Sequence, residues 1–170
     1  MSGEASVQTS YGLYPALGFP GQVYDSDTPK VVISRIASEV IAYGKYVYYT
    51  DENCHIGTTQ ANISSNRGGV ALRDPANPNG AYQIGDAVAI LVDGFVWVPT
   101  EEAVVVTDAV FVRVAGASGA SQANGWFRND AGGTGAGNPA GAAWHKGGTS
   151  LAVLRLGTAG LAGGATTPTS

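Results

Sequence analysis

Short runs of β-branched and aromatic residues, separated by glycine, constrain the fold of this chain more than any other feature. Glycine occurs 25 times in 170 residues, about twice its average frequency. Between the glycines lie apolar runs at 31–33, 46–50, 88–92, 95–98, 104–106, 110–114 and 151–156. Short strands at close spacing, with turn residues between them, are typical of a sandwich or barrel. The length favours one domain, so we expect a mainly β, single-domain antiparallel β-sandwich or barrel.

The segment 87–98 predicts a β-hairpin. Asp93-Gly94 lies between two apolar runs, and this dipeptide favours a type I′ turn because both turn residues need positive φ. One face of the ribbon then carries Val88, Ile90, Val92, Phe95 and Trp97, and the other carries Ala87, Ala89, Leu91, Val96 and Val98. A hairpin with one face in water is polar on that face, whereas this one is apolar on both. Either loops of the same sandwich cover the second face, or another chain does.

Two regions depart from the strand pattern. Residues 34–43 place Ile36, Val40 and Tyr43 at the spacing of a short helix, but their β-branched residues fit an extended segment equally well. Residues 115–150 predict two long Gly/Ala loops around short strands at 125–128 and 142–145. We expect a flexible N-terminal arm at 1–12, a β domain at 13–157 and a flexible Gly/Thr/Pro tail at 158–170.

Charge and hydropathy exclude several classes of partner. Nine Lys and Arg face thirteen Asp and Glu, which gives a net charge of −4, and the basic residues form no cluster. Nucleic-acid binders need a basic face, so we expect no nucleic-acid partner. No apolar run reaches the roughly 18 residues of a membrane span, and no basic-then-apolar leader begins the chain. Only 13% of residues are charged, against about a quarter in an average protein, which suggests that much of the surface is covered by neighbours.

The sequence contains no complete set of catalytic or metal-binding residues. Cys54 and His55 are adjacent, so in a strand their side chains point to opposite faces. A pair between Cys54 and His145 stays open, but it needs an orienting group and an oxyanion hole. The acidic turns around Asp25 and Asp51 lack the pattern of a calcium loop. The G-x-G-x-x-A match within 132–140 lacks the strand and helix of a dinucleotide site. We therefore expect no enzymatic activity, no cofactor and no metal.

Four tyrosines gather in one short stretch and leave two functions open. Tyr43, Tyr46, Tyr48 and Tyr49 fit packing in the core or at a subunit interface, where tyrosine is enriched. They also fit stacking on sugars, as in a β-sandwich that binds carbohydrate as an adhesion module.

The order of several sequence blocks resembles the cement proteins of tailed bacteriophages, which decorate the head. The blocks are Tyr14-Pro-Ala-Leu-Gly-Phe-Pro-Gly21, Asp25, Ile33-Ser-Arg35, Glu39-Val-Ile-Ala-Tyr-Gly44, Val110-Phe-Val-Arg-Val114, Gly125-Trp-Phe-Arg-Asn-Asp130 and Ala143-Trp144. The likeness covers residues 12–157, except the Gly/Ala insertion at 131–142, and the tail after Gly157 matches no part of the pattern.

This resemblance implies a non-enzymatic virion protein that binds the outer surface of a capsid assembled in the host cytoplasm. Its partners would be the major capsid protein and further copies of itself, as a homotrimer or alternatively a dimer. Candidate residues for the subunit or capsid interface are Tyr14, Phe19, Tyr43, Tyr46, Tyr48, Leu91, Val96 and Val98.

Overall fold

The computed structural model describes residues 18–65, 67–77, 79–114, 124–132 and 136–157, and these ranges are mainly β, as predicted. The strands are β1 (Val31–Ala37), β2 (Ile41–Ala42), β3 (Tyr46–Thr50), β4 (Asn53–Ile56), β5 (Gly68–Ala71), β6 (Ala81–Tyr82), β7 (Ala87–Pro99), β8 (Phe111–Arg113), β9 (Phe127–Arg128), β10 (Ala136–Gly137), β11 (Ala143–Lys146) and β12 (Leu151–Leu156); α1 spans Gln60–Ser64. The predicted arm at 1–12 and the tail at 158–170 lie outside the described residues.

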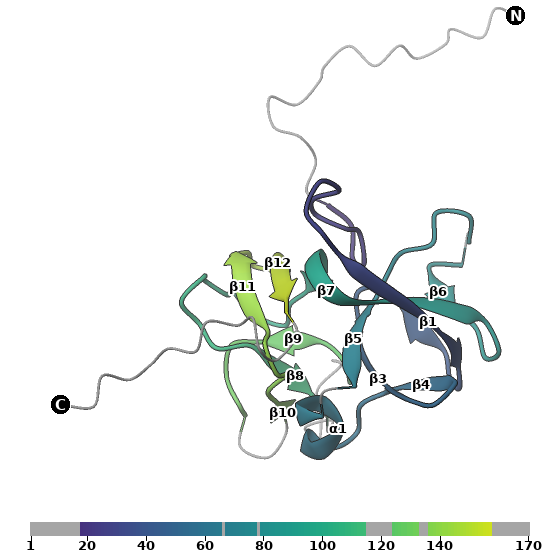
Figure 1. Ribbon diagram of the computed structural model, residues 1–170. Coiled ribbons are helices and arrows are strands. Elements are labelled where there is room, and N and C mark those ends of the chain that lie inside the picture. Colours follow the sequence, from purple (N-terminus) through teal and green to yellow (C-terminus); the bar gives the residue numbers. More distant parts are fainter. Residues whose placement is uncertain (1–17, 66, 78, 115–123, 133–135, 158–170) are drawn as a thin grey trace, which may run out of the picture.

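Five strands close into a barrel-like ring. They follow the order β1, β4, β3, β5 and β7, and a pairing between β1 and β7 completes the ring. The β1–β4 pair is parallel and the other pairs of the ring are antiparallel. β7 extends beyond the ring, where it pairs with β12, and β12 pairs with β11. Figure 1 shows the ring on one side of the molecule, with β11 and β12 above β8, β9 and β10 on the other.

The hairpin predicted at Asp93-Gly94 is wrong, because β7 runs straight through these two residues as one strand of 13 residues. Only Gly94 has a positive φ, at 132°, whereas a type I′ turn needs it at both positions. The first half of β7 pairs with β1 and β5, and the second half pairs with β12. These ladders supply hydrogen-bond partners along the strand, so tertiary pairing overrides the local preference for a turn.

β7 contributes to two separate cores, which explains why it is apolar on both faces. The barrel core consists of Ala37, Ile41, Tyr43, Val47, Cys54, Ile56, Ala71, Tyr82, Val88 and Ile90. The outer core consists of Tyr46, Ile63, Val70, Leu72, Leu91, Val96, Val98, Val104, Val110, Val112, Val114, Phe127, Trp144, Ala152, Leu154 and Leu156. Side chains normally alternate between the two faces of a strand, so an odd-numbered and an even-numbered residue lie on opposite faces. Leu91 nevertheless shares the outer core with Val96 and Val98, so the alternation shifts by one residue near Gly94. Both faces of β7 are thus covered by this chain itself.

Several shorter predictions can be compared with the structure directly. The segment 34–43 is extended rather than helical, since β1 and β2 occupy most of it. The run 104–106 forms no named strand, and its Val104 makes only an isolated bridge to Gly148. The acidic dipeptide Asp51-Glu52 is a turn, as expected, and joins β3 to β4 with Asp51 at a φ of 23°.

The helix α1 has no counterpart among the elements predicted from the sequence. It begins with a capping box, in which the Thr59 side chain accepts from the Asn62 amide and the Asn62 side chain accepts from the Thr59 amide. Such reciprocal caps satisfy two of the free amides at a helix start. Ile63 is the buried residue of this helix and joins the outer core.

Candidate functional site

The structure places most of the candidate interface residues inside the protein. Leu91, Val96 and Val98 have 0% exposure in the outer core. Their expected position at a surface covered by another chain is therefore wrong, because it depended on a hairpin that does not form. Tyr46 is also buried there, and its hydroxyl donates to the carbonyl oxygen of Ile63 at 3.3 Å.

Of the remaining candidates, Phe19 and Tyr48 lie nearer the surface, and Tyr14 is outside the described residues. Phe19 is 56% exposed. Tyr43 is buried and packs edge-on against Tyr82, with ring centroids 5.3 Å apart. Tyr48 is half-buried and stacks on His55 at 5.4 Å.

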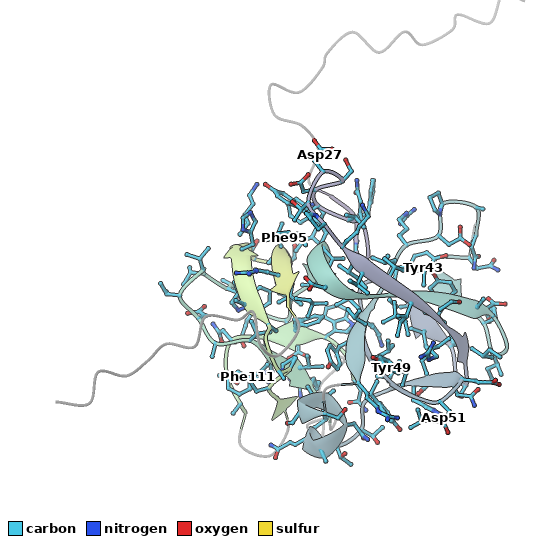
Figure 2. The ribbon with its side chains drawn as sticks, viewed as in Figure 1. Asp27, Tyr43, Tyr49, Asp51, Phe95 and Phe111 are labelled. Carbon is cyan, nitrogen blue, oxygen red and sulfur yellow. The ribbon has the colours of Figure 1, made fainter. Side chains whose placement is uncertain are left out.

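The four tyrosines at 43–49 do not form one stacking platform. Tyr43 belongs to the barrel core and Tyr46 to the outer core. The guanidinium carbon of Arg35 lies over the Tyr49 ring, 5.0 Å from the ring centroid. Figure 2 shows Tyr43 and Tyr49 on different parts of the barrel. Packing inside the chain therefore accounts for most of these aromatic side chains.

A patch of exposed aliphatic side chains, which we call the β1 patch, lies along the outer face of β1 and beside the end of this strand. It consists of Val32, Ile36, Val40 and Ile84, which are 43%, 43%, 52% and 71% exposed. Ile33 and Ala37 on β1 face the barrel core instead, so Val32 and Ile36 share the outer face because side chains alternate along a strand. The Gly85 amide donates to the Ala37 carbonyl at 2.8 Å, which brings Ile84 beside the end of the strand.

Val40 joins the patch through the neighbouring strand pair. Ile41 pairs with Tyr82, so Val40, one residue before Ile41, lies near Ile84, two residues after Tyr82. The sequence did not reveal this patch because apolar and polar residues are mixed on both faces of β1: the outer face has Ser34 between Val32 and Ile36, and the inner face includes Arg35. The β1 patch is identified by the exposed fractions of its four side chains rather than by the composition of the strand.

The segment 18–24 forms an added edge along β7. The Gly21 amide donates to the Trp97 carbonyl at 2.8 Å, and the Trp97 amide donates to the Gln22 carbonyl at 2.9 Å. The Tyr24 ring packs edge-on against Trp97, with centroids 5.6 Å apart. Trp97 is only 7% exposed, and this segment helps to cover it.

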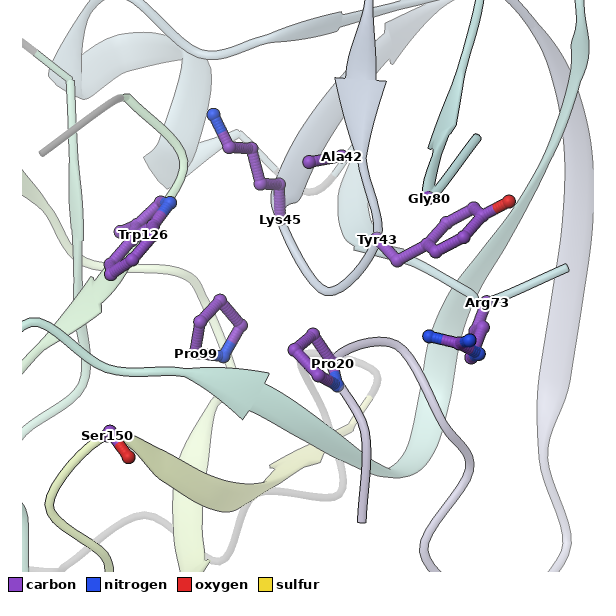
Figure 3. A pocket seen from close by; sticks show the side chains of 9 residues that line it. All are labelled: Pro20, Ala42, Tyr43, Lys45, Arg73, Gly80, Pro99, Trp126 and Ser150. Atoms are coloured by element: carbon purple, nitrogen blue, oxygen red, sulfur yellow. The ribbon is translucent and has the colours of Figure 1, made fainter. Parts of the chain in front are cut away.

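A surface groove of about 410 Å³ lies where this segment meets the barrel and β9. Its lining residues are Pro20, Ala42, Tyr43, Lys45, Arg73, Gly80, Pro99, Trp126 and Ser150. Figure 3 shows Lys45 and Trp126 on one side of the groove and Tyr43 and Arg73 on the other. Burial lowers the pKa of Lys45, and nearby Glu39 partly offsets this effect.

A buried charge cluster joins β8 and β9 to the segment after β7. Arg113 donates from two nitrogens to the Glu101 carboxylate, one of them at 2.6 Å. Arg128 Nη1 lies 3.5 Å from Glu101 Oε2, which also accepts from Arg113. The side chains of Arg113, Glu101 and Arg128 are 8%, 5% and 12% exposed. The bonds to Glu101 raise the pKa of Arg113. All three charges are engaged with one another, which is typical of a structural cluster.

The candidate catalytic pair is not brought together. Cys54 has 0% exposure in the barrel core, and burial raises the pKa of its thiol to about 11. His145 instead packs against Phe95 and Tyr24, with ring centroids 4.7 and 5.4 Å away. Within the described residues, no group of three or more His, Cys, Asp or Glu could hold a metal ion. No helix in this part of the chain is long and apolar enough to cross a membrane.

Comparison with known proteins agrees with the resemblance that the sequence blocks indicated. No curated protein sequence matches the chain. Among solved structures, a chain from "The capsid of Myoviridae Phage XM1" is similar, with a TM-score of 0.64 and 18% identity over 92% of this chain and 98% of that one. At that identity the likeness concerns the fold. A family model described as structural cement protein (E217 gp24/Pam3 gp6) matches residues 7–161. Because this match spans nearly the whole chain, the protein belongs to the phage structural cement protein family.

Proposed function

We propose that this protein binds the outer surface of a phage capsid and cements neighbouring major-capsid subunits, without enzymatic activity. The observation that carries this proposal is the family match over residues 7–161. The net charge of −4 supports an outer position, since a protein lining the inner side of a filled head would face the negative charge of DNA.

The β1 patch is the surface that we propose for a protein contact. Full burial of an aliphatic side chain stabilises by about 1.5–3 kcal/mol. The four side chains of the patch are 43–71% exposed, so covering them contributes about 3–6 kcal/mol in all. Association costs about 4–15 kcal/mol, so this patch alone gives a marginal contact.

A marginal contact becomes useful when it is repeated. We propose that the protein acts as a homotrimer, with a dimer as the alternative, because linked contacts raise the effective concentration of each further one. Native mass spectrometry of the free protein and of protein released from heads measures this state. A monomer in both samples would contradict the oligomer.

The proposed capsid binding is tested with heads that lack this protein. Purified wild-type protein should bind them saturably in a sedimentation assay and raise the temperature at which they release DNA. Ile36→Asp should weaken binding at least about tenfold, because about 1.4 kcal/mol is a factor of ten. Val106→Asp is the matched control, since Val106 is 57% exposed but lies outside the patch.

Two results would contradict the proposal. Wild-type protein that does not bind heads would exclude a cementing role, and a specific hit on a glycan array would then favour a carbohydrate-binding module. Equal loss of binding in Ile36→Asp and Val106→Asp would instead exclude the β1 patch as the contact.

A further inference from the structure

We propose that the groove between Lys45 and Arg73 binds an acidic segment of a neighbouring major-capsid subunit. This inference rests on the proposed function and adds to it the chemistry of one contact. It is separate from the β1 patch, since none of the four patch residues lines the groove.

The charges of the groove are unusual for this protein. Its lining includes two of the nine Lys and Arg residues and none of the thirteen Asp and Glu residues. Among the described residues, Lys45 and Arg73 make no ion pair, in contrast to Arg113 and Arg128. The carboxylates that act on the lining residues stand outside the lining itself: Glu39 acts on Lys45 and accepts from the Ile56 amide at 2.8 Å, and Asp74 and Asp86 act on Tyr43. A carboxylate supplied from outside would therefore complete the electrostatics of the groove.

The two cations are already held in place. The Arg73 guanidinium lies 4.9 Å from the Phe19 ring and 5.8 Å from the Tyr43 ring, between two aromatic side chains. Lys45 is 9% exposed as a whole residue, so most of its aliphatic stem is packed. Side chains fixed before binding lose little conformational entropy when the partner arrives.

The remaining walls suit apolar side chains next to the carboxylate. Trp126 is half-buried, and Pro20 and Pro99 form the wall beside it. Gly44 allows this wall to close, because a Cβ on it would lie 2.8 Å from Pro99 and 2.9 Å from Pro20. An Asp or Glu flanked by an aliphatic or aromatic residue therefore matches both parts of the lining.

Zero-length crosslinking tests the contact on decorated heads. A water-soluble carbodiimide joins an amine to a carboxylate only when the two touch. We expect mass spectrometry to find an amide between Lys45 and an Asp or Glu of the major capsid subunit, and to find none in Lys45→Gln. A crosslink from Lys45 to a second copy of this chain, or no crosslink at Lys45, would overturn the proposal.

Binding measurements give an independent readout. Arg73→Gln, at an exposed position, should weaken head binding at least about tenfold and reduce its dependence on salt, and Lys45→Gln should behave similarly. Lys30→Gln and Lys146→Gln are matched controls, because both lysines are exposed and neither lines the groove. If wild type binds heads and Arg73→Gln binds equally well, the groove proposal is wrong while the cementing function stands. If wild type does not bind heads, both are wrong.

Discussion

Leu91→Ala tests whether β7 is one strand buried by its own chain. Leu91 has 0% exposure and lies opposite Val32 of β1 on one side and Val70 of β5 on the other. Removing three carbon atoms from such a site costs about 2–5 kcal/mol, depending on how far the core collapses. For a chain of this size each kcal/mol lowers the melting temperature by about 2–4 °C, so we expect a decrease of about 4–20 °C.

The assay is thermal and urea denaturation followed by near-ultraviolet circular dichroism. Ile36→Ala is the control, because Ile36 is also an aliphatic residue of the barrel but is 43% exposed, and its free energy of unfolding should fall by about 1 kcal/mol, less than in Leu91→Ala. A Leu91→Ala variant that unfolds like wild type but assembles poorly would refute the reasoning, since that is the behaviour of an interface residue on a two-stranded hairpin.

Three further predictions follow from other buried features. Gly94→Ala should destabilise the fold by about 1–3 kcal/mol, because the φ of Gly94 is 132° and the new Cβ would lie 3.1 Å from the Cβ of Lys30; a melting temperature equal to wild type would contradict this backbone strain. Glu101→Ala should cost about 3–5 kcal/mol, since Arg113 and Arg128 lose their shared carboxylate, and urea denaturation measures the loss. Cys54 should not react with a thiol reagent at pH 8 until guanidinium unfolds the protein, because with a pKa of about 11 only about one thiol in a thousand is ionised; rapid labelling of native protein would contradict its burial.

Some of the strands were predictable because each needs only a local signal. Runs of β-branched residues identified β3 and β12 with the bounds that the structure has, 46–50 and 151–156. The Asp93-Gly94 turn failed for the opposite reason. Its local signal was strong, but β1, β5 and β12 supply partners along both halves of β7. Those partners come from distant parts of the sequence, so local preference could not reveal them.

The candidate interface was harder to predict than the fold. Two apolar faces on one segment indicate that both are covered, but not whether the cover comes from the same chain. Here Val96 packs in the outer core and Val88 in the barrel core. The groove could not be predicted either, because Lys45, Arg73 and Trp126 are far apart in the sequence and meet only through the fold.

An electron cryomicroscopy reconstruction of heads with and without this protein tests the central claim most directly. We expect additional density on the outer surface of the shell, with each copy in contact with at least two major-capsid subunits. The fold should fit this density with the β1 patch facing a neighbouring protein. Density on the inner surface, density that touches a single capsid subunit, or no difference between the two maps would contradict a cementing role.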